Sequence, residues 1–186
     1  MAGTPRLSEF LGEMSFSSHK ELGFEKILLV EGPTEVPTIQ QFLRMIGKDH
    51  KILLLPLHGH MPKADEFDEM MRISTNIAAL IDSERTAEAT PLDQDRQDFL
   101  DMCAKRAVKC HALDRRATEN YFPESVVRRV FGSSYRALAP YEKLSDANPH
   151  WSKSQNWKMA ADMKFDDIRA TDLGQFLEAL LVRVTP

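Results

Sequence analysis

The sequence predicts an α/β fold: a parallel sheet of about four strands, flanked by helices and followed by a helical C-terminal extension. Three short runs, at residues 26–31, 52–57 and 77–82, are apolar along almost their whole length. Continuous apolar runs of this length are typical of strands buried on both faces of a parallel sheet. Helical patterns separate the runs, and this alternation favours parallel strands joined by right-handed crossovers.

The elements follow one another in a regular order. A helix is expected at 33–46, where apolar residues recur at helical spacing and Gly47 provides the stop. After the second strand and the loop 58–60, a second helix is expected at 64–73. The third strand leads into a polar, mobile loop at 83–91 and a helix at 93–106. The run 108–113 is half polar, which predicts a fourth strand at the edge of the sheet.

The character of the chain changes after Tyr121. Helices are expected at 123–131, 156–163 and 172–184, the last capped by Thr171, and a loop is expected at 139–153. The first residues predict at most one short helix around 7–14. We therefore divide the sequence into a lead-in at 1–23, an α/β domain at 24–125 and a helical extension at 126–186.

Composition limits the classes of function. The chain has 186 residues, enough for one ordinary domain, and a net charge of −4. That charge argues against binding nucleic acid through overall positive charge alone. The sequence has neither a signal peptide pattern nor an apolar run long enough to span a membrane. Its two cysteines, Cys103 and Cys110, match no common zinc pattern, and a cytoplasmic location is the expectation.

Acidic residues follow the first and third predicted strands. Glu31 ends the first strand, Asp82 ends the third, and Glu35 lies one turn into the helix after Glu31. Ligands of open parallel sheets bind outside the carboxyl ends of the strands, so these side chains are expected at one edge. Glu84 stands two residues after Asp82, and in an extended segment both carboxylates would share a side.

Four carboxylates gathered at one edge would repel one another, and would raise each other's pKa, unless a cation lay between them. A site built from oxygen ligands suits Mg²⁺ or Mn²⁺. Two such ions, roughly 3.5–4 Å apart, are the arrangement used in phosphodiester hydrolysis. For any single acid the alternative is a helix cap or a side chain that faces water.

Three motifs, in this order, resemble those of OLD-family nucleases (overcoming lysogenization defect), which contain a Toprim domain. The segment LVEGPTE at 29–35 resembles the first Toprim motif in its E-G-x-T-E form. The segment ALIDSE at 79–84 resembles the D-x-D motif, with Glu in the third place. The segment RRATENYFP at 115–123 resembles an OLD-type motif, R-x-x-E-N-Y-hydrophobic-P. The resemblance covers about residues 24–125.

The resemblance implies a Toprim endonuclease or nickase that hydrolyses DNA with two Mg²⁺ or Mn²⁺ ions. It implies catalytic, metal-facing roles for Glu31, Glu35, Asp82 and Glu84, and a metal-facing role for Glu119. OLD proteins also carry a lysine after the Toprim core, which would stabilise charge on the scissile phosphate.

The best match to this lysine is Lys158, with Lys153 and Lys164 as rivals.

Basic residues on the same edge are candidates for contact with DNA. Arg115 and Arg116 could offset the charge of the phosphate, or could belong to a solvated face. His58 and His60 flank Gly59 in the loop after the second strand. They are candidate contacts to DNA phosphates or metal, with an ordinary surface loop as the alternative.

OLD proteins place an ABC-type ATPase region ahead of the Toprim region. No G-x-x-x-x-G-K-[ST] phosphate loop occurs in this sequence. The resemblance therefore implies the C-terminal nuclease region of a longer protein, with DNA and the ATPase region as partners and no membrane association. The alternative is a free-standing Toprim protein that works with a separate ATPase.

Two other functions remain open at this point. One is a different Toprim chemistry, of the primase or topoisomerase type, although a topoisomerase would need a partner tyrosine in a separate domain. The other is a non-catalytic regulatory or interaction module built on a Toprim-like core. The joint presence of Glu31, Asp82 and Glu84 disfavours the second.

Overall fold

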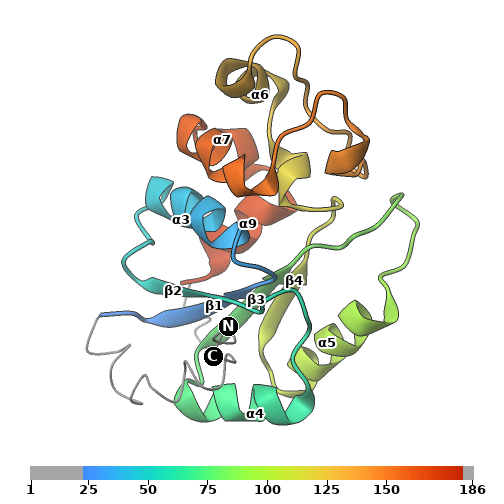
Figure 1. Cartoon of the computed structure of the whole chain (residues 1–186). Helices are drawn as coiled ribbons and strands as arrows, with labels where there is room; N and C mark the ends of the chain where they lie inside the picture. Colours follow the sequence, from blue (N-terminus) through green and yellow to red (C-terminus); the bar gives the residue numbers. More distant parts are fainter. Residues whose placement is uncertain (1–22, 182–186) are drawn as a thin grey trace, which may run out of the picture.

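The computed structural model describes residues 23–181 and has the α/β architecture that the sequence predicts (Figure 1). The strands are β1 (Lys26–Val30), β2 (Ile52–Pro56), β3 (Ile77–Ile81) and β4 (Lys109–Ala112). They form one parallel sheet in the order β2-β1-β3-β4, so the half-polar fourth strand lies at an edge as expected. Val30 pairs with Leu80, and the residues that follow β1 and β3 therefore emerge at the same edge of the sheet.

Helices cover both faces of the sheet. Helix α3 (Glu35–Met45) lies on one face, and α4 (Ala64–Ile73) and α5 (Gln94–Lys105) lie on the other (Figure 1). Leu28 of β1 packs in the core on the α3 side, whereas its neighbour Leu29 packs in the core beneath α4 and α5. Because successive side chains of a strand point to opposite faces, both faces of β1 are buried, which explains its unbroken apolar run.

The C-terminal extension packs onto the α3 side of the sheet (Figure 1). It contains α6 (Glu124–Phe131), α7 (Asn156–Asp162), α8 (Asp166–Arg169) and α9 (Asp172–Ala179). Met159 of α7 and Leu177 of α9 are fully buried in the same core as Leu28. The extension therefore completes the core on this face of the sheet.

Most predicted boundaries agree with the structure to within two residues. The first helix begins at Glu35, because residues 32–34 form a turn in which the Glu35 amide donates to the Gly32 carbonyl at 3.2 Å. Short 3₁₀ turns at Thr118–Tyr121, Leu144–Asp146 and Lys153–Gln155, and the short helix α8, are elements that the periodicity did not predict. Helix α9 ends at Ala179, short of the end at 184 that the sequence predicts, and residues 180 and 181 form a turn. The helix expected around 7–14 lies outside the described residues.

Local sequence explains the start of α9. The Thr171 side chain accepts a hydrogen bond from the Gly174 amide at 3.2 Å, as expected for the cap of this helix. A side chain at position 174 would place its Cβ 2.2 Å from the Ile168 carbonyl oxygen, so only glycine allows α8 and α9 to approach so closely. In the part of the chain that the structure describes, no helix has the length and apolar character needed to cross a membrane.

Candidate active site

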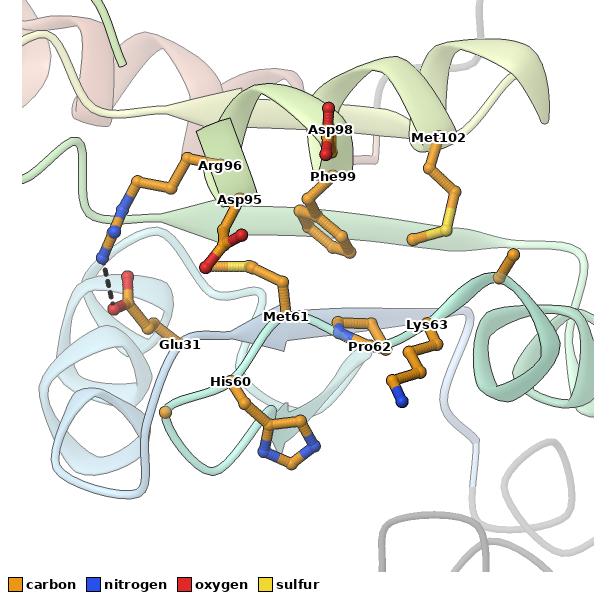
Figure 2. Close-up of a pocket in the computed structure, with 12 residues that line it drawn as sticks. Glu31, His60, Met61, Pro62, Lys63, Asp95, Arg96, Asp98, Phe99 and Met102 are labelled. Atoms are coloured by element: carbon orange, nitrogen blue, oxygen red, sulfur yellow. Dashed lines mark hydrogen bonds and ion pairs between the residues drawn. The ribbon is translucent and has the colours of Figure 1, made fainter. Parts of the chain in front are cut away.

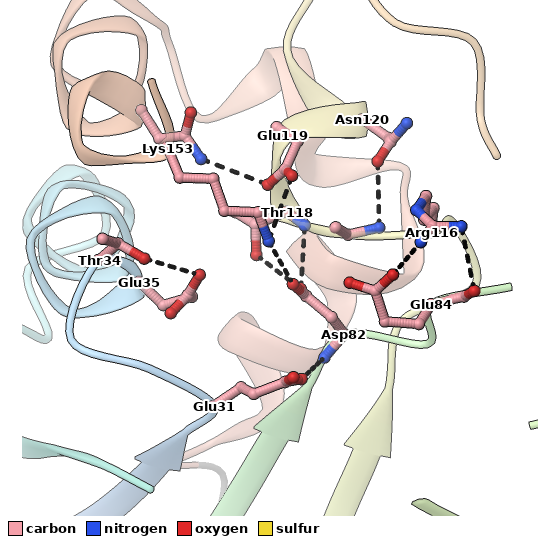
Figure 3. Close-up of polar contacts among 12 residues, drawn as sticks. Glu31, Thr34, Glu35, Asp82, Glu84, Arg116, Thr118, Glu119, Asn120 and Lys153 are labelled. Atoms are coloured by element: carbon pink, nitrogen blue, oxygen red, sulfur yellow. Dashed lines mark hydrogen bonds and ion pairs between the residues drawn. The ribbon is translucent and has the colours of Figure 1, made fainter. Parts of the chain in front are cut away.

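Glu31 and Asp82 meet at the carboxyl edge of the sheet (Figure 3). Glu31 follows β1, Asp82 follows β3, and the Asp82 amide donates a hydrogen bond to Glu31 Oε2 at 3.1 Å. Asp82 is only 3% exposed. The parallel register of β1 and β3 thus brings together two acids that stand 51 residues apart in the sequence.

Asp82 is a buried carboxyl group in an acidic neighbourhood. Burial raises the pKa of Asp82 to about 8; the Lys153 ammonium opposes the shift, and the nearby Glu119, Glu31 and Glu35 add to it. The Asp82 carboxylate accepts a hydrogen bond from the Thr118 amide at 3.1 Å. Ionised Asp82 is therefore poorly compensated by its own protein, which is the state that a bound cation would relieve.

Two further buried acids complete this group. Glu35 is the first residue of α3, and its carboxylate accepts a hydrogen bond from the Thr34 hydroxyl at 3.1 Å. Glu119 lies in the 3₁₀ turn Thr118–Tyr121 and accepts from Asn156 Nδ2 at 3.4 Å. Glu31, Glu35, Asp82 and Glu119, which we call the carboxylate cluster, thus come from four different segments of the chain (Figure 3).

Glu84 lies at the margin of the carboxylate cluster. The extended geometry expected for this residue is wrong: its φ is +52°, a left-handed conformation that a residue with a side chain rarely adopts. The Glu84 carboxylate forms an ion pair with Arg116, and the Glu84 amide donates to the Arg116 carbonyl at 2.9 Å. The turn thus directs Glu84 towards the 115–118 segment instead of alongside Asp82 (Figure 3).

Lys153 is the cation at the centre of the cluster. Its Nζ lies 3.3 Å from Asp82 Oδ2 and 3.3 Å from Glu119 Oε1. Burial lowers the pKa of Lys153, but the attraction of Asp82, Glu119 and Glu35 outweighs it and raises the pKa above the ordinary value. Lys153 is therefore held as an ammonium ion against two buried carboxylates.

The structure places Lys153, and not Lys158, beside the carboxylates. Lys158 is exposed on α7, and its side chain has no hydrogen bond or ion pair to another described residue. The reason is the orientation of α7, whose neighbouring residues Met159 and Ala160 face the core. Lys164, the other rival, is exposed beyond the end of α7.

Arg96 of α5 is a second cation that the sequence did not reveal. Its Nη2 lies 2.7 Å from Glu31 Oε1, and its Nε donates to the Asp82 carbonyl at 2.8 Å. Burial lowers the pKa of Arg96, but Glu31 and Asp93 outweigh it and raise the pKa. In the sequence Arg96 stands 65 residues from Glu31, in a polar helix where a charged residue predicts only contact with solvent.

The candidate DNA-binding residues fall into two groups. Arg115 donates to the Asn120 carbonyl at 2.7 Å and lies over the Tyr121 ring, and Arg116 is paired with Glu84, so both guanidinium groups are engaged within the protein. His58 and His60 are exposed and have no partner among the described residues. Their loop lies against the site, because the Gly59 amide donates to the Glu31 carbonyl at 2.9 Å.

Two hollows adjoin the carboxylate cluster. A groove of about 540 Å³ reaches Glu31 and Arg96 from the side covered by α4 and α5 (Figure 2). A hollow of about 250 Å³ reaches Glu119 and Lys153 from the side of the 143–151 segment, with Lys143 and His150 on its rim. A narrow crevice is lined by Glu31, Glu35 and Asp82. A chain-like ligand that crosses the cluster can therefore contact both hollows.

The donor chemistry of the cluster fits a hard divalent cation. All four acids offer oxygen ligands, and burial together with the neighbouring Glu119, Glu31 and Glu35 raises the pKa of Asp82. As the side chains lie, no group of three or more His, Cys, Asp or Glu residues within 23–181 is already arranged around a metal position. Lys153 and Arg96 supply positive charge instead, and an incoming metal ion would compete with them for the carboxylate oxygens.

Comparisons of this chain with models of protein families, with curated proteins and with solved structures find no match.

Proposed function

We propose that this chain is a Toprim-type nuclease region, as in OLD-family proteins, that hydrolyses DNA phosphodiester bonds with Mg²⁺ or Mn²⁺. The observation that carries the proposal is the buried Asp82, which lies against Glu31 at the end of the sheet with an unfavourable negative charge. A buried acid with a raised pKa at the carboxyl end of a parallel strand is typical of functional sites.

The carboxylate cluster, with Glu84 at its margin, would hold two ions. When bound, two such ions lower the pKa of a coordinated water and stabilise charge on the leaving 3′ oxygen. A carboxylate that is free of metal, Glu31 or Glu35, takes the proton from the attacking water. Lys153 lies where its ammonium can offset the charge that grows on the phosphate.

DNA contacts in this proposal come from side chains that the protein leaves free. His58 and His60 are exposed next to Glu31, and Lys143 is exposed on the rim of the smaller hollow. Arg115 and Arg116 support the site through their contacts with Asn120 and Glu84. A local set of hydrogen-bond donors that includes one lysine can bind phosphates even in a chain whose net charge is −4.

The proposal also includes a partner and a cellular location. A Toprim region of this family would work with an ABC-type ATPase region, either in the same longer chain or as a separate protein. The proposal also places the protein in the cytoplasm, in keeping with two cysteines that form no disulfide framework.

A plasmid-nicking assay tests the proposed activity. Supercoiled DNA is incubated with the protein in Mg²⁺, in Mn²⁺ and in EDTA, and we expect nicked product only with metal. Asp82→Ala should lower the rate by at least about 100-fold, the order expected for the loss of a central catalytic group. Asp162→Ala is the matched control, since Asp162 is an exposed acid paired with Arg129 away from the cluster. Undiminished nicking by Asp82→Ala would refute the mechanism.

One observation favours a second candidate, the non-catalytic module. Glu31, Asp82 and Glu84 each have a cationic partner, so the acids could serve only to hold α5 and the C-terminal segment in place. If the protein is folded but does not nick DNA in either Mg²⁺ or Mn²⁺, that result would support this candidate. A topoisomerase-type reaction is disfavoured at Tyr121, which is buried and donates to Asp172, so that its pKa is raised.

A further inference from the structure

The groove beside Glu31 has a composition different from that of the carboxylate cluster (Figure 2). Its floor is apolar: Phe99 is buried, and Met61 and Met102 are half-buried from opposite sides. Thioethers and an aromatic ring make a polarisable, adaptable surface for a flat apolar ligand. With about 540 Å³, the groove lies in the size range of sites for small molecules, roughly 300–1,000 Å³.

The polar groups of the groove limit the charge of its occupant. Asp95 of α5 extends towards Met61, and its carboxylate has no hydrogen bond or ion pair to another described residue (Figure 2). Together with Glu31 it places negative charge along the α5 side, which would repel a phosphate but can accept hydrogen bonds from N–H groups. Lys63 and His60 lie on the loop side of the groove and are exposed.

The groove and the cluster share a wall. Glu31 belongs to both, and Arg96, which lies 2.7 Å from Glu31, lines the groove. A phosphate held at the carboxylates would therefore have its own nucleotide, or the next one, at the mouth of the groove. The Lys63 ammonium and the His60 ring lie on the loop side and could donate hydrogen bonds to the adjoining phosphates, while the apolar floor could receive the base between them.

We propose that this groove binds one unpaired nucleobase of the DNA strand whose phosphate lies at the carboxylate cluster. This proposal rests on the proposed function. It adds that the DNA is unpaired at the bound base, because a base can enter the groove only after it has left the duplex stack. The base lies against Met61, Met102 and the edge of Phe99, and Asp95 accepts hydrogen bonds from its N–H groups. Stacking of this kind tolerates different bases, because each has a flat π surface.

A binding experiment in EDTA tests the groove without any cleavage. The probes are a fluorescently labelled trinucleotide of deoxythymidines and the same trinucleotide with its middle base removed, which keeps every phosphate. We expect the full-length chain to bind the intact probe roughly 5-fold or more tightly, the lower end of the effect of one stacked base. Equal affinity for the two probes would overturn the proposal.

Two variants test whether the preference for the intact probe arises in the groove. Ala64→Trp fills the groove from an exposed position at the start of α4, and Met102→Glu places a charge on its floor. Both should bind the two probes equally. Ala104→Trp, at an exposed position of α5 outside the groove, should keep the preference of the wild type. A preference that survives Ala64→Trp and Met102→Glu would refute this location.

The nicking assay and the binding experiment test the two proposals separately, so one proposal can fail while the other stands. A preference for the intact probe without metal-dependent nicking would support the groove as a base site and overturn the nuclease. Nicking without any base preference would support the nuclease and overturn the groove.

Discussion

Lys153 is the residue on which the electrostatics of the site depend most. Its ammonium lies between two carboxylates that are each almost fully buried, Asp82 and Glu119. The same position lets it neutralise charge on a phosphate that enters the cluster. Lys158, which is exposed on α7, shares none of these contacts, so substitutions of Lys153 and Lys158 can be compared directly.

Lys153→Ala should lower the nicking rate by about 100-fold or more, because a positive charge aimed at the reacting phosphate is lost. The loss should appear in kcat, since the charge matters most as the phosphate gains negative charge. Lys158→Ala should keep the rate within about 2-fold, as expected for a surface substitution. Equal losses in the two variants, measured on proteins with native circular dichroism, would contradict this role for Lys153.

Glu31 and Asp82 were predictable from the sequence as neighbours, whereas Lys153 was only one of three candidate lysines and Arg96 was not predicted. Glu31 and Asp82 follow apolar strand runs, and the rule that parallel strands end at a common edge is enough to bring them together. Arg96 and Lys153 reach the same place from α5 and from the turn before α7. Their positions depend on how those segments pack on the sheet, which no local pattern in the sequence encodes.

At the scale of elements, one aspartate joins α9 to the sheet edge. Asp172, the first residue of α9, lies 2.8 Å from His111 Nε2 of β4. It also accepts hydrogen bonds from the Tyr121 hydroxyl at 2.7 Å and the Asp114 amide at 2.9 Å. Burial raises the pKa of Asp172, but the hydrogen bonds from His111, Asp114 and Tyr121 outweigh it and lower the pKa below its ordinary value of 3.8.

The lowered pKa fixes the pH dependence of this contribution to stability. The folded protein favours the ionised carboxylate, so the contribution is complete above pH 3.8 and is lost as the pH falls through the lower, folded pKa. Asp172→Asn should therefore lower the free energy of unfolding by about 1–3 kcal/mol at pH 7, as for a hydrogen-bonded charged group. The difference from the wild type should shrink below about pH 4.

Urea denaturation at several pH values measures this difference. Asp166→Asn is the control, because Asp166 is 79% exposed and its ion pair with Arg169 lies at the surface. It should change the free energy of unfolding by less than about 0.5 kcal/mol at any pH. A cost of Asp172→Asn that is the same at pH 3 and pH 7 would show that charge is not involved.

The main elements were predictable because each has a strong local signal. The strands are continuous apolar runs, and the helices have apolar residues at helical spacing with capping or stop residues at their ends. The 3₁₀ turns at Thr118–Tyr121 and Lys153–Gln155 have no such signal, since three or four residues are too few to show a period. These turns carry Glu119 and Lys153, so the weakest predictions fell on part of the site.

At the scale of the whole molecule, the α/β region and the C-terminal extension share a core. Met159 of α7 is completely buried with Phe42 of α3 and Leu28 of β1. The extension also supplies Lys153 to the carboxylate cluster. Neither region can bury its apolar face alone, and we therefore expect residues 23–181 to unfold as one cooperative unit.

The distribution of natural probes allows a direct test of this expectation. Both tryptophans, Trp151 and Trp157, lie in the extension, and both cysteines, Cys103 and Cys110, lie in the α/β region. Tryptophan fluorescence and thiol reactivity should therefore give the same urea midpoint in one protein. Met159→Ala should lower the free energy of unfolding by about 2–5 kcal/mol, the usual cost of truncating a buried methionine. Because the core is shared, both probes should shift equally.

Lys158→Ala, on the exposed side of the same helix, should leave both midpoints almost unchanged. If the extension were a separate folding unit, Met159→Ala would shift the fluorescence midpoint and leave the thiol midpoint in place. That outcome would also weaken the proposed active site, since an extension that can unfold independently would remove Lys153 from Asp82 while the sheet stayed intact. A single shared transition would instead mean that the carboxylate cluster and its lysine form and disappear together.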